Sequence, residues 1–161
     1  MYYHKQQQAV QHSTSTLESY FYPLDRLRDW NRIYGRSGFT QYQLVVPTEA
    51  AKTALPQVLD ECRKHGQHSF LTVLKLFGPA NTQSPLSFPM EGYTLTLDLK
   101  LNQRTLKLCN AHAVVHHHAG RVYLAKDVRM SPQTLAAGYS GLDAVAAVRQ
   151  QLSQHQNVAS D

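Results

Sequence analysis

The chain has 161 residues, of which 42% are hydrophobic and 9% aromatic, which fits one globular domain and excludes disorder of the whole chain. Its formal net charge is +5, but the sixteen Lys and Arg residues are dispersed without a run of five, so the charge is only weak evidence for nucleic acid. No apolar run is long enough for a signal peptide or a membrane span, so we expect a cytoplasmic protein.

The N-terminal part changes character at Tyr20. Residues 1–19 are polar and aperiodic, with the runs QQQ and STST, and we expect them to form a disordered leader. The next segment, FYPLDRLRDWNRIYG, has Pro23 where a helix would begin and Gly35 where it would end. Its apolar stripe comprises Leu24, Leu27, Trp30 and Ile33 or Tyr34. The sequence therefore predicts a short amphipathic helix here.

A strand, a helix and a second strand are predicted next. Alternating residues predict a strand in GFTQYQLVVP. Residues 48–66 predict a helix with Thr48 as its N-cap and Gly66 as its C-cap. Pro56 lies inside this helix, so we expect a kink or a late start. The side chains expected to be buried are Leu55, Val58, Leu59 and Cys62. The second strand is predicted over 69–77.

The second half of the chain predicts a similar set of elements after a proline-rich loop. A strand over 93–99 has leucines on one face and polar residues on the other. A helix over 102–119, with Leu108, Ala111 and Val115 on its stripe, precedes a strand over 121–124. Further helices are predicted from Ser131 and over 142–152. The order predicts an α+β, ferredoxin-like βαββαβ fold, with an antiparallel sheet, helices on one face and flanking N- and C-terminal helices.

In a ferredoxin-like sheet the second face, here called the open face, meets water, a ligand or another domain. The residues that the alternation assigns to the open face are Gln41, Gln43, Lys75, Phe77, Thr94, Thr96 and Asp98. Neutral hydrogen-bonding groups around one lysine suit a polyhydroxylated ligand better than a phosphate backbone. The alternative is a face that is merely solvated.

The same topology also occurs in RNA-binding domains, which stack bases on aromatic residues of the central strands. The third strand of this chain offers Thr94 and Thr96 instead, and Tyr93 falls on the face of the leucines. We therefore expect no nucleic acid as a partner.

Four histidines lie in or next to one predicted helix: His112, His116, His117 and His118. The first two are one helical turn apart, which is a spacing that metal ligands use. No HExxH glutamate or CxxC pair accompanies them, so we expect no metal and interpret them as exposed residues near a helix end. Cys62 and Cys109 lack CxxC spacing and are predicted to be buried thiols. The sequence has no P-loop, GxGxxG or GxSxG motif.

The segment GRVYLAKDVRM, residues 120–130, runs from a strand into a set of charges. Lys126 follows the end of the strand, with Asp127 beside it and Tyr123 three residues before it. A cation held at a strand end near an aromatic ring suits an anionic or electron-rich ligand. A solvated loop after an edge strand is the alternative.

Several segments, in this order, resemble FAD-linked oxidases of the vanillyl-alcohol oxidase superfamily. They are FYPLDRLRDWNRIYG, GFTQYQLVVP, FLTVLKLFGP, PLSFPMEGYTLTLD and GRVYLAKDVRMSPQTLAAGY. The resemblance runs from about Tyr20 to the C-terminus and is to the C-terminal half of these enzymes. It implies that residues 20–124 form a substrate-binding cap domain whose open sheet face lies over the flavin ring. It also implies that residues 125–161 form a helical segment that packs on an FAD-binding domain absent from this sequence.

The resemblance implies roles for individual residues as well. Lys126 resembles the active-site lysine that contacts flavin and substrate, and Tyr123 resembles its neighbour at the flavin ring. The residues implied to line the sugar pocket are Gln41, Gln43, Lys75, Phe77, Thr94 and Thr96. Thr94 and Thr96 stand where relatives carry an asparagine and a cysteine, so the thiol chemistry of that site is absent and the substrate contacts are expected to differ.

The function implied by the resemblance is that of the substrate-binding part of an oxidoreductase, which passes a hydride from a sugar or polyol hydroxyl carbon to N5 of FAD. Its partners would be an FAD-binding domain, in cis or in trans, and the sugar. Because that domain would bind most of the FAD, we expect the chain alone to be inactive. The alternative is a stand-alone ferredoxin-like binding module without redox activity.

Overall fold

The structure is a computed structural model that describes residues 12–22, 28–80, 84–105, 109–126 and 130–158. The chain divides into two compact units, Met1–Ile33 and Tyr34–Asp161. The second unit contains all four strands of the described sheet.

The first unit contains a short helix, α2 (Leu17–Phe21). Its N-cap is Thr16, whose Oγ1 accepts a hydrogen bond from the Ser19 N–H over 3.2 Å. This bond satisfies one of the backbone donors that a helix start leaves free. Residues 17–19, which we expected to belong to a disordered leader, are therefore helical.

The helix predicted from Pro23 falls partly on residues 23–27, which lie outside the described residues. The described part is a 3-10 helix, η2 (Trp30–Tyr34). It ends before Gly35, as predicted, and Gly35 has a φ of 71°, a backbone conformation that glycine adopts without strain.

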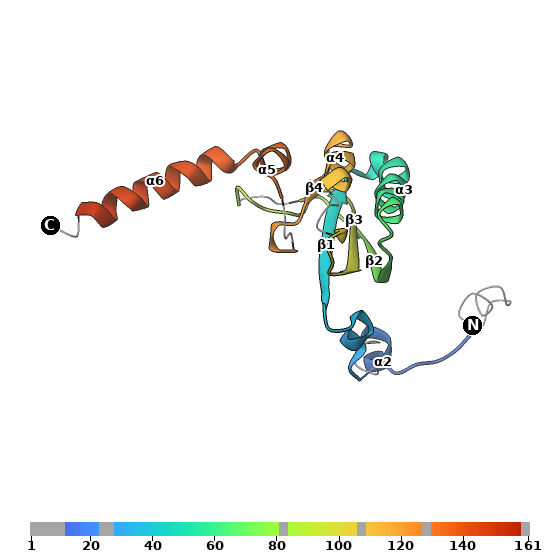
Figure 1. Ribbon diagram of the computed structural model, residues 1–161. Helices are drawn as coiled ribbons and strands as arrows, with labels where there is room; N and C mark the ends of the chain where they lie inside the picture. The colour runs from blue at the N-terminus through green and yellow to red at the C-terminus, as the bar shows by residue number, and fades with distance from the viewer. Residues whose placement is uncertain (1–11, 23–27, 81–83, 106–108, 127–129, 159–161) are drawn as a thin grey trace. The chain divides into compact units, whose positions relative to one another are not determined.

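Four strands form one antiparallel sheet in the order β2-β3-β1-β4. They are β1 (Phe39–Val46), β2 (Ser69–Phe77), β3 (Gly92–Lys100) and β4 (Arg121–Val122). Helices α3 (Thr48–Lys64) and α4 (Cys109–His117) pack against each other on one side of this sheet (Figure 1). This is the α+β, ferredoxin-like architecture predicted from the order of the elements.

The hydrophobic core lies between the sheet and these two helices. The strands contribute Tyr42, Leu44, Val46, Leu95, Leu97, Leu99 and Val122. The helices contribute Ala51, Ala54, Val58, Cys62, Ala111 and Val115. Burial of one aliphatic side chain of this size stabilises the fold by about 2 kcal/mol. The strand residues are those that the alternation assigned to the helix side, so the sidedness of the sheet is confirmed.

Helix α3 differs from its prediction in three respects. Pro47 is the N-cap and makes no side-chain hydrogen bond, whereas Thr48 is already helical. The helix includes Pro56 within its span, so the late start is excluded and the expected kink stays a prediction. Leu59 is 39% exposed instead of buried, because it follows Val58 and lies about 100° round the helix from the buried stripe.

The end of α3 is a Schellman motif, in which backbone N–H groups beyond the helix satisfy its last carbonyls. The Gly66 N–H donates to the Arg63 carbonyl and the Gln67 N–H to the Cys62 carbonyl, each over 2.9 Å. Gly66 has a φ of 64°, as this motif requires. His65 is the C-cap, so the predicted C-cap, Gly66, lies one residue beyond the observed one.

Helix α4 begins at Cys109, later than the predicted start at Asn102. The Asn102 side chain favours a turn instead, since its Oδ1 accepts from the Arg104 N–H over 2.8 Å and from the Thr105 N–H over 3.0 Å. Leu108 lies outside the described residues. Ala111 and Val115 are fully buried, as predicted.

The described residues after β4 include three further helices. Only Arg121–Val122 pair as a strand, and Leu124 already begins a 3-10 helix, η4 (Leu124–Lys126). Helix α5 (Pro132–Gly138) has the predicted cap at Ser131, whose Oγ accepts from the Thr134 N–H over 3.1 Å. Helix α6 (Leu142–Val158) runs further than predicted. In the described parts of the chain, no helix has the length and apolar character needed to cross a membrane.

One edge of the sheet remains uncovered by helices. β2 pairs only with β3 among the described strands, and Leu74 and Leu76 lie opposite Leu95 and Tyr93 on the helix side of the sheet. They are nevertheless 54% and 63% exposed. An apolar strip therefore runs beside the unpaired edge of β2.

Candidate functional site

The strand register brings the predicted pocket residues together on the open face. It pairs Gln41 with Asp98, Gln43 with Thr96, Lys75 with Thr94 and Phe77 with Gly92. Since alternate residues of a strand share a face, all of these side chains lie on the sheet face opposite the core leucines. The seven open-face residues thus form one continuous patch over β1, β2 and β3.

The residues of this patch differ in how far solvent reaches them. Gln41, Gln43, Thr96 and Phe77 are half-buried, and Lys75 is exposed. Thr94 and Asp98 are each only 1% exposed. A ligand approaching the open face would therefore meet the glutamines, Thr96 and Lys75, with Thr94 and Asp98 beneath them.

The two glutamines are each bonded to one of the buried residues. Gln41 Nε2 donates to Asp98 Oδ1 over 2.8 Å. Gln43 Nε2 donates to Thr94 Oγ1 over 3.1 Å, and Thr94 Oγ1 donates to the Leu44 carbonyl over 2.8 Å. The two glutamine hydrogen bonds therefore each join a side-chain amide on β1 to a side chain on β3.

One end of the open face is covered by the loop between β2 and β3. The ring of Phe88 in this loop lies 4.6 Å from the ring of Tyr123 and 6.2 Å from that of Phe77, between centroids. Phe88 is 5% exposed, and Val45 of the same face is fully buried. The sequence does not single out Phe88, because a loop has no periodicity that assigns a residue to a face.

Arg121 and Tyr139 hold this loop against β4 and the end of α5. Arg121 Nη1 donates to the Ser87 carbonyl over 2.9 Å, and the guanidinium lies 5.5 Å from the centre of the Tyr139 ring. The Tyr139 hydroxyl donates to the Val122 carbonyl over 2.7 Å. The loop, β4 and the end of α5 therefore form one connected structure.

Tyr34 covers the opposite end of the open face. Its ring stacks on Phe39 at 4.7 Å and meets Phe70 edge to face at 6.3 Å. The pKa of the Tyr34 phenol is raised by burial and by the nearby negative charge of Asp98. The Tyr34 hydroxyl and Asp98 Oδ2 are buried and have no hydrogen-bond partner among the described residues. Burial of Asp98 is therefore explained in part by an aromatic residue outside the sheet.

Lys126 lies at the end of a turn that starts beside Gln43. The Tyr123 N–H donates to the Gln43 carbonyl over 2.8 Å, which extends the pairing of β1 and β4 by one residue. The Lys126 N–H then donates to the Tyr123 carbonyl over 3.1 Å. Lys126 is half-buried. The backbone thus links Lys126 to the strand that carries both glutamines, while Asp127 and Arg129 lie outside the described residues.

The histidines do not form a metal site in the described part of the chain, where no group of three or more possible ligands occurs. His112 is buried and its ring stacks on Tyr42 at 5.4 Å, so the prediction of an exposed residue is wrong for it. It faces the core because α4 packs on β1. His116 is half-buried, and its pKa is lowered by burial. His118 is half-buried and bonds Gln57 over 2.9 Å.

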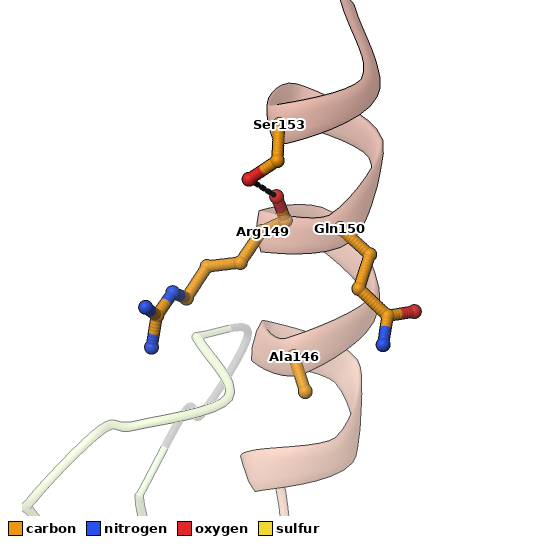
Figure 2. A pocket seen from close by; sticks show the side chains of 4 residues that line it. All are labelled: Ala146, Arg149, Gln150 and Ser153. Carbon is orange, nitrogen blue, oxygen red and sulfur yellow. Dashed lines mark hydrogen bonds between the residues drawn. The ribbon is translucent and has the colours of Figure 1, made fainter. Parts of the chain in front are cut away.

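Three surface hollows lie away from the open face. The first, on α6, has a volume of about 680 Å³ and is bordered by Ala146, Arg149, Gln150 and Ser153 (Figure 2). All four are exposed and come from one helix. The second, of about 310 Å³, lies between the loop anchored by Arg121 and the end of α5. The third, of about 250 Å³, lies between α3 and the strands β2 and β3. None of the three contains a predicted site residue.

No family model matches the chain. The chain is 38% identical over 146 residues to the decaprenylphosphoryl-β-D-ribose oxidase of Mycolicibacterium smegmatis (strain ATCC 700084 / mc(2)155). The match covers 90% of this chain but only 31% of the relative, so the chain spans less than a third of that enzyme's length. The resemblance to an FAD-linked oxidase predicted from the sequence motifs is thereby confirmed, and the chain is similar to one part of such an oxidase.

Proposed function

We propose that this chain is the substrate-binding part of an FAD-dependent oxidoreductase that oxidises a hydroxyl group of a sugar or polyol. The observation that carries the proposal is the strand register, which gathers Gln41, Gln43, Lys75 and Thr96 on one sheet face beside the turn that ends at Lys126. The similarity to an oxidase named for a ribose-containing compound supports the same class of substrate.

The residues present fit a flavin ring next to this face. A flavin is planar, with an apolar edge and an edge of carbonyl and nitrogen acceptors, so it needs aromatic or apolar contact on one side and a donor on the other. Tyr123, half-buried against Phe88, supplies the aromatic surface, and the half-buried Lys126 supplies a cationic donor. We propose that these two residues contact the flavin and that a separate FAD-binding domain holds most of the cofactor.

Each accessible residue of the open face has a role that its chemistry allows. Gln41, Gln43 and Thr96 offer neutral hydrogen-bonding groups to sugar hydroxyls, and Phe77 offers an apolar surface to the carbon skeleton. Lys75 gives an anionic substituent of the substrate a partner at the rim. Bound FAD would accept the hydride. Lys126 would favour the negative charge that develops on the reacting groups.

The proposal is tested by adding an FAD-binding part in trans. The chain is mixed with FAD and the separately expressed FAD-binding part of the Mycolicibacterium relative, and reduction of a dye by methyl β-D-ribofuranoside is followed. We expect the chain alone to be colourless and inactive, and the mixture to bind FAD and reduce the dye. A stand-alone binding module would show neither gain. A yellow, active preparation of the chain alone would contradict the proposed division of the FAD site.

A further inference from the structure

We infer that the buried residues Thr94 and Asp98 are positioning residues, which orient the Gln43 and Gln41 side chains so that both present carbonyl oxygens, and therefore acceptors, to the substrate. This inference rests on the proposed function and makes it more specific: the two glutamine carbonyls would accept hydrogen bonds from hydroxyl groups of the substrate. It also assigns Thr94 a place beneath the pocket rather than in contact with the sugar.

The direction of the Gln43 amide follows from the Thr94 hydroxyl. A hydroxyl has one proton, and Thr94 donates it to the Leu44 carbonyl over 2.8 Å. Its oxygen can then only accept from Gln43, 3.1 Å away, so the Gln43 group that faces Thr94 must be the NH₂. The alternative orientation would place two acceptors against each other in a site where Thr94 is 1% exposed.

The direction of the Gln41 amide follows from Asp98 in the same way. A carboxylate accepts hydrogen bonds and donates none. The 2.8 Å contact between Gln41 Nε2 and Asp98 Oδ1 therefore also requires the NH₂ group on the Asp98 side. Asp98 is 1% exposed, so water does not readily replace Gln41 as the hydrogen-bond donor to its carboxylate.

The consequence is a pair of matched acceptors on the accessible side. Both glutamines use an N–H toward β3, and their carbonyl oxygens have no hydrogen-bond partner among the described residues. The two residues are two positions apart on β1, so the oxygens repeat along one strand. Such a pair suits neighbouring hydroxyls of a sugar, because each hydroxyl can donate one proton.

The first part of the test measures amide orientation on the chain itself, without substrate. Thr94→Val removes the hydroxyl but keeps the shape, and Thr94→Ser restores it. Asp98→Leu and Asp98→Asn form the corresponding pair, since asparagine keeps an acceptor oxygen. We expect hydrogen exchange of the Gln43 side-chain amide to be about fivefold faster in T94V than in T94S, and of the Gln41 amide about fivefold faster in D98L than in D98N. The Thr94 variants test the orientation of Gln43, and the Asp98 variants test that of Gln41. An unchanged exchange rate of the Gln43 amide in a folded T94V protein would overturn the inference.

The second part tests which groups form hydrogen bonds to the substrate, using the chain assembled with FAD and the separate FAD-binding part. Its probes are methyl β-D-ribofuranoside and analogues in which one hydroxyl is replaced by hydrogen or by fluorine. Fluorine can accept but not donate, so at a position read by Gln41 or Gln43 we expect both replacements to raise KM by the same factor. T94V should raise KM for the parent sugar about fivefold with little change in kcat, and T94S should reverse this.

The outcomes separate the inference from the proposed function. Fluorine analogues that bind as well as the parent at every position would mean that donors read the sugar, which overturns the inference while leaving the oxidase intact. A wild-type assembly that never reduces dye overturns the proposed function, and with it the substrate role of the acceptors. In that case the exchange measurement still decides whether Thr94 and Asp98 orient the amides. An effect of T94V on kcat that T94S does not reverse would indicate a purely structural role and would contradict the inference.

Discussion

The rings of Phe88 and Tyr123 lie with their centroids 4.6 Å apart, which joins the loop between β2 and β3 to the turn that carries Lys126. This contact, together with that of Phe88 to Phe77, closes one end of the open face. The candidate site therefore depends on a loop residue as much as on the strands.

The first prediction concerns Phe88. Phe88→Ala should lower the free energy of unfolding by about 3–5 kcal/mol, because a 5% exposed ring leaves a cavity against two other aromatic rings. Urea unfolding followed by circular dichroism measures this. Phe70→Ala, at a residue that is 54% exposed, is the matched control and should cost about 1 kcal/mol or less. Equal losses in the two variants would mean that Phe88 is not packed as described.

A second prediction concerns Gly120, where α4 leads into β4. A Cβ at this position would lie 2.5 Å from the Val45 carbonyl oxygen and 2.8 Å from Val46 Cγ1, so Gly120→Ala should destabilise the fold by about 1–3 kcal/mol. Gly78→Ala is the control, because nothing lies within 4 Å of its Cβ. Thermal unfolding of both variants gives the comparison. A Gly120→Ala protein as stable as the Gly78→Ala protein would show that the backbones do not approach so closely.

A third prediction concerns the buried thiol of Cys62. Burial raises its pKa from 9.0 to about 11, so at pH 8 it should react with Ellman's reagent only after unfolding. The assay uses Cys109→Ser, so that Cys62 is the one remaining cysteine of the two in the chain. Between pH 9 and 11 the unfolded chain loses the thiol proton before the folded chain does. Stability should therefore fall as the pH rises through this window.

The reaction rate supplies the check on Cys62. It should rise steeply with pH up to about 11 in the folded protein, and addition of urea at pH 8 should abolish the protection. Fast labelling at pH 8 without denaturant would contradict the burial of this side chain.

A fourth prediction concerns His116, whose ring nitrogens are buried and have no hydrogen-bond partner among the described residues. Burial lowers its pKa below 6.5, so the unfolded chain takes up a proton more readily than the folded chain. The stability that depends on neutral His116 should be complete above pH 6.5 and should decrease as the pH falls toward the lowered pKa.

The matched variants for this titration are His116→Leu and His117→Leu, since His117 is exposed on the same helix. Melting temperatures at pH 7.5 and 5.5 should differ less in His116→Leu than in the wild type, whereas His117→Leu should keep the wild-type difference. The reverse pattern would place the acid-sensitive group elsewhere.

The sequence allowed the sheet and its two faces to be predicted, because strict alternation in β1 and β3 leaves one register in which all leucines are buried. The alternation therefore assigns Gln41, Gln43 and Thr96 to the open face, where they lie in the structure. The burial of Asp98 could not be predicted, since it depends in part on Tyr34, which lies outside the strands. Local periodicity carries no information on such long-range cover.

The errors at helix ends have local causes of a different kind. Asn102 accepts hydrogen bonds from two backbone N–H groups and stabilises a turn where the sequence pattern predicts a helix. His112 is buried because its helix face packs on Tyr42, although histidines near a helix end are usually exposed. In both cases the interactions of one side chain outweigh the structural preference that the sequence pattern indicates.

The last prediction concerns Lys126 in the proposed oxidase. With FAD and the separate FAD-binding part present, Lys126→Met should lower kcat about 100-fold, because a cationic donor near the reacting groups is lost. Lys52→Met, at an exposed residue of α3, is the matched control and should keep wild-type activity. Unfolding by urea should be similar in the two variants, since Lys126 forms no salt bridge with a described residue. Wild-type activity in Lys126→Met would refute the catalytic role of Lys126 but would leave a substrate-binding role of the open face in place.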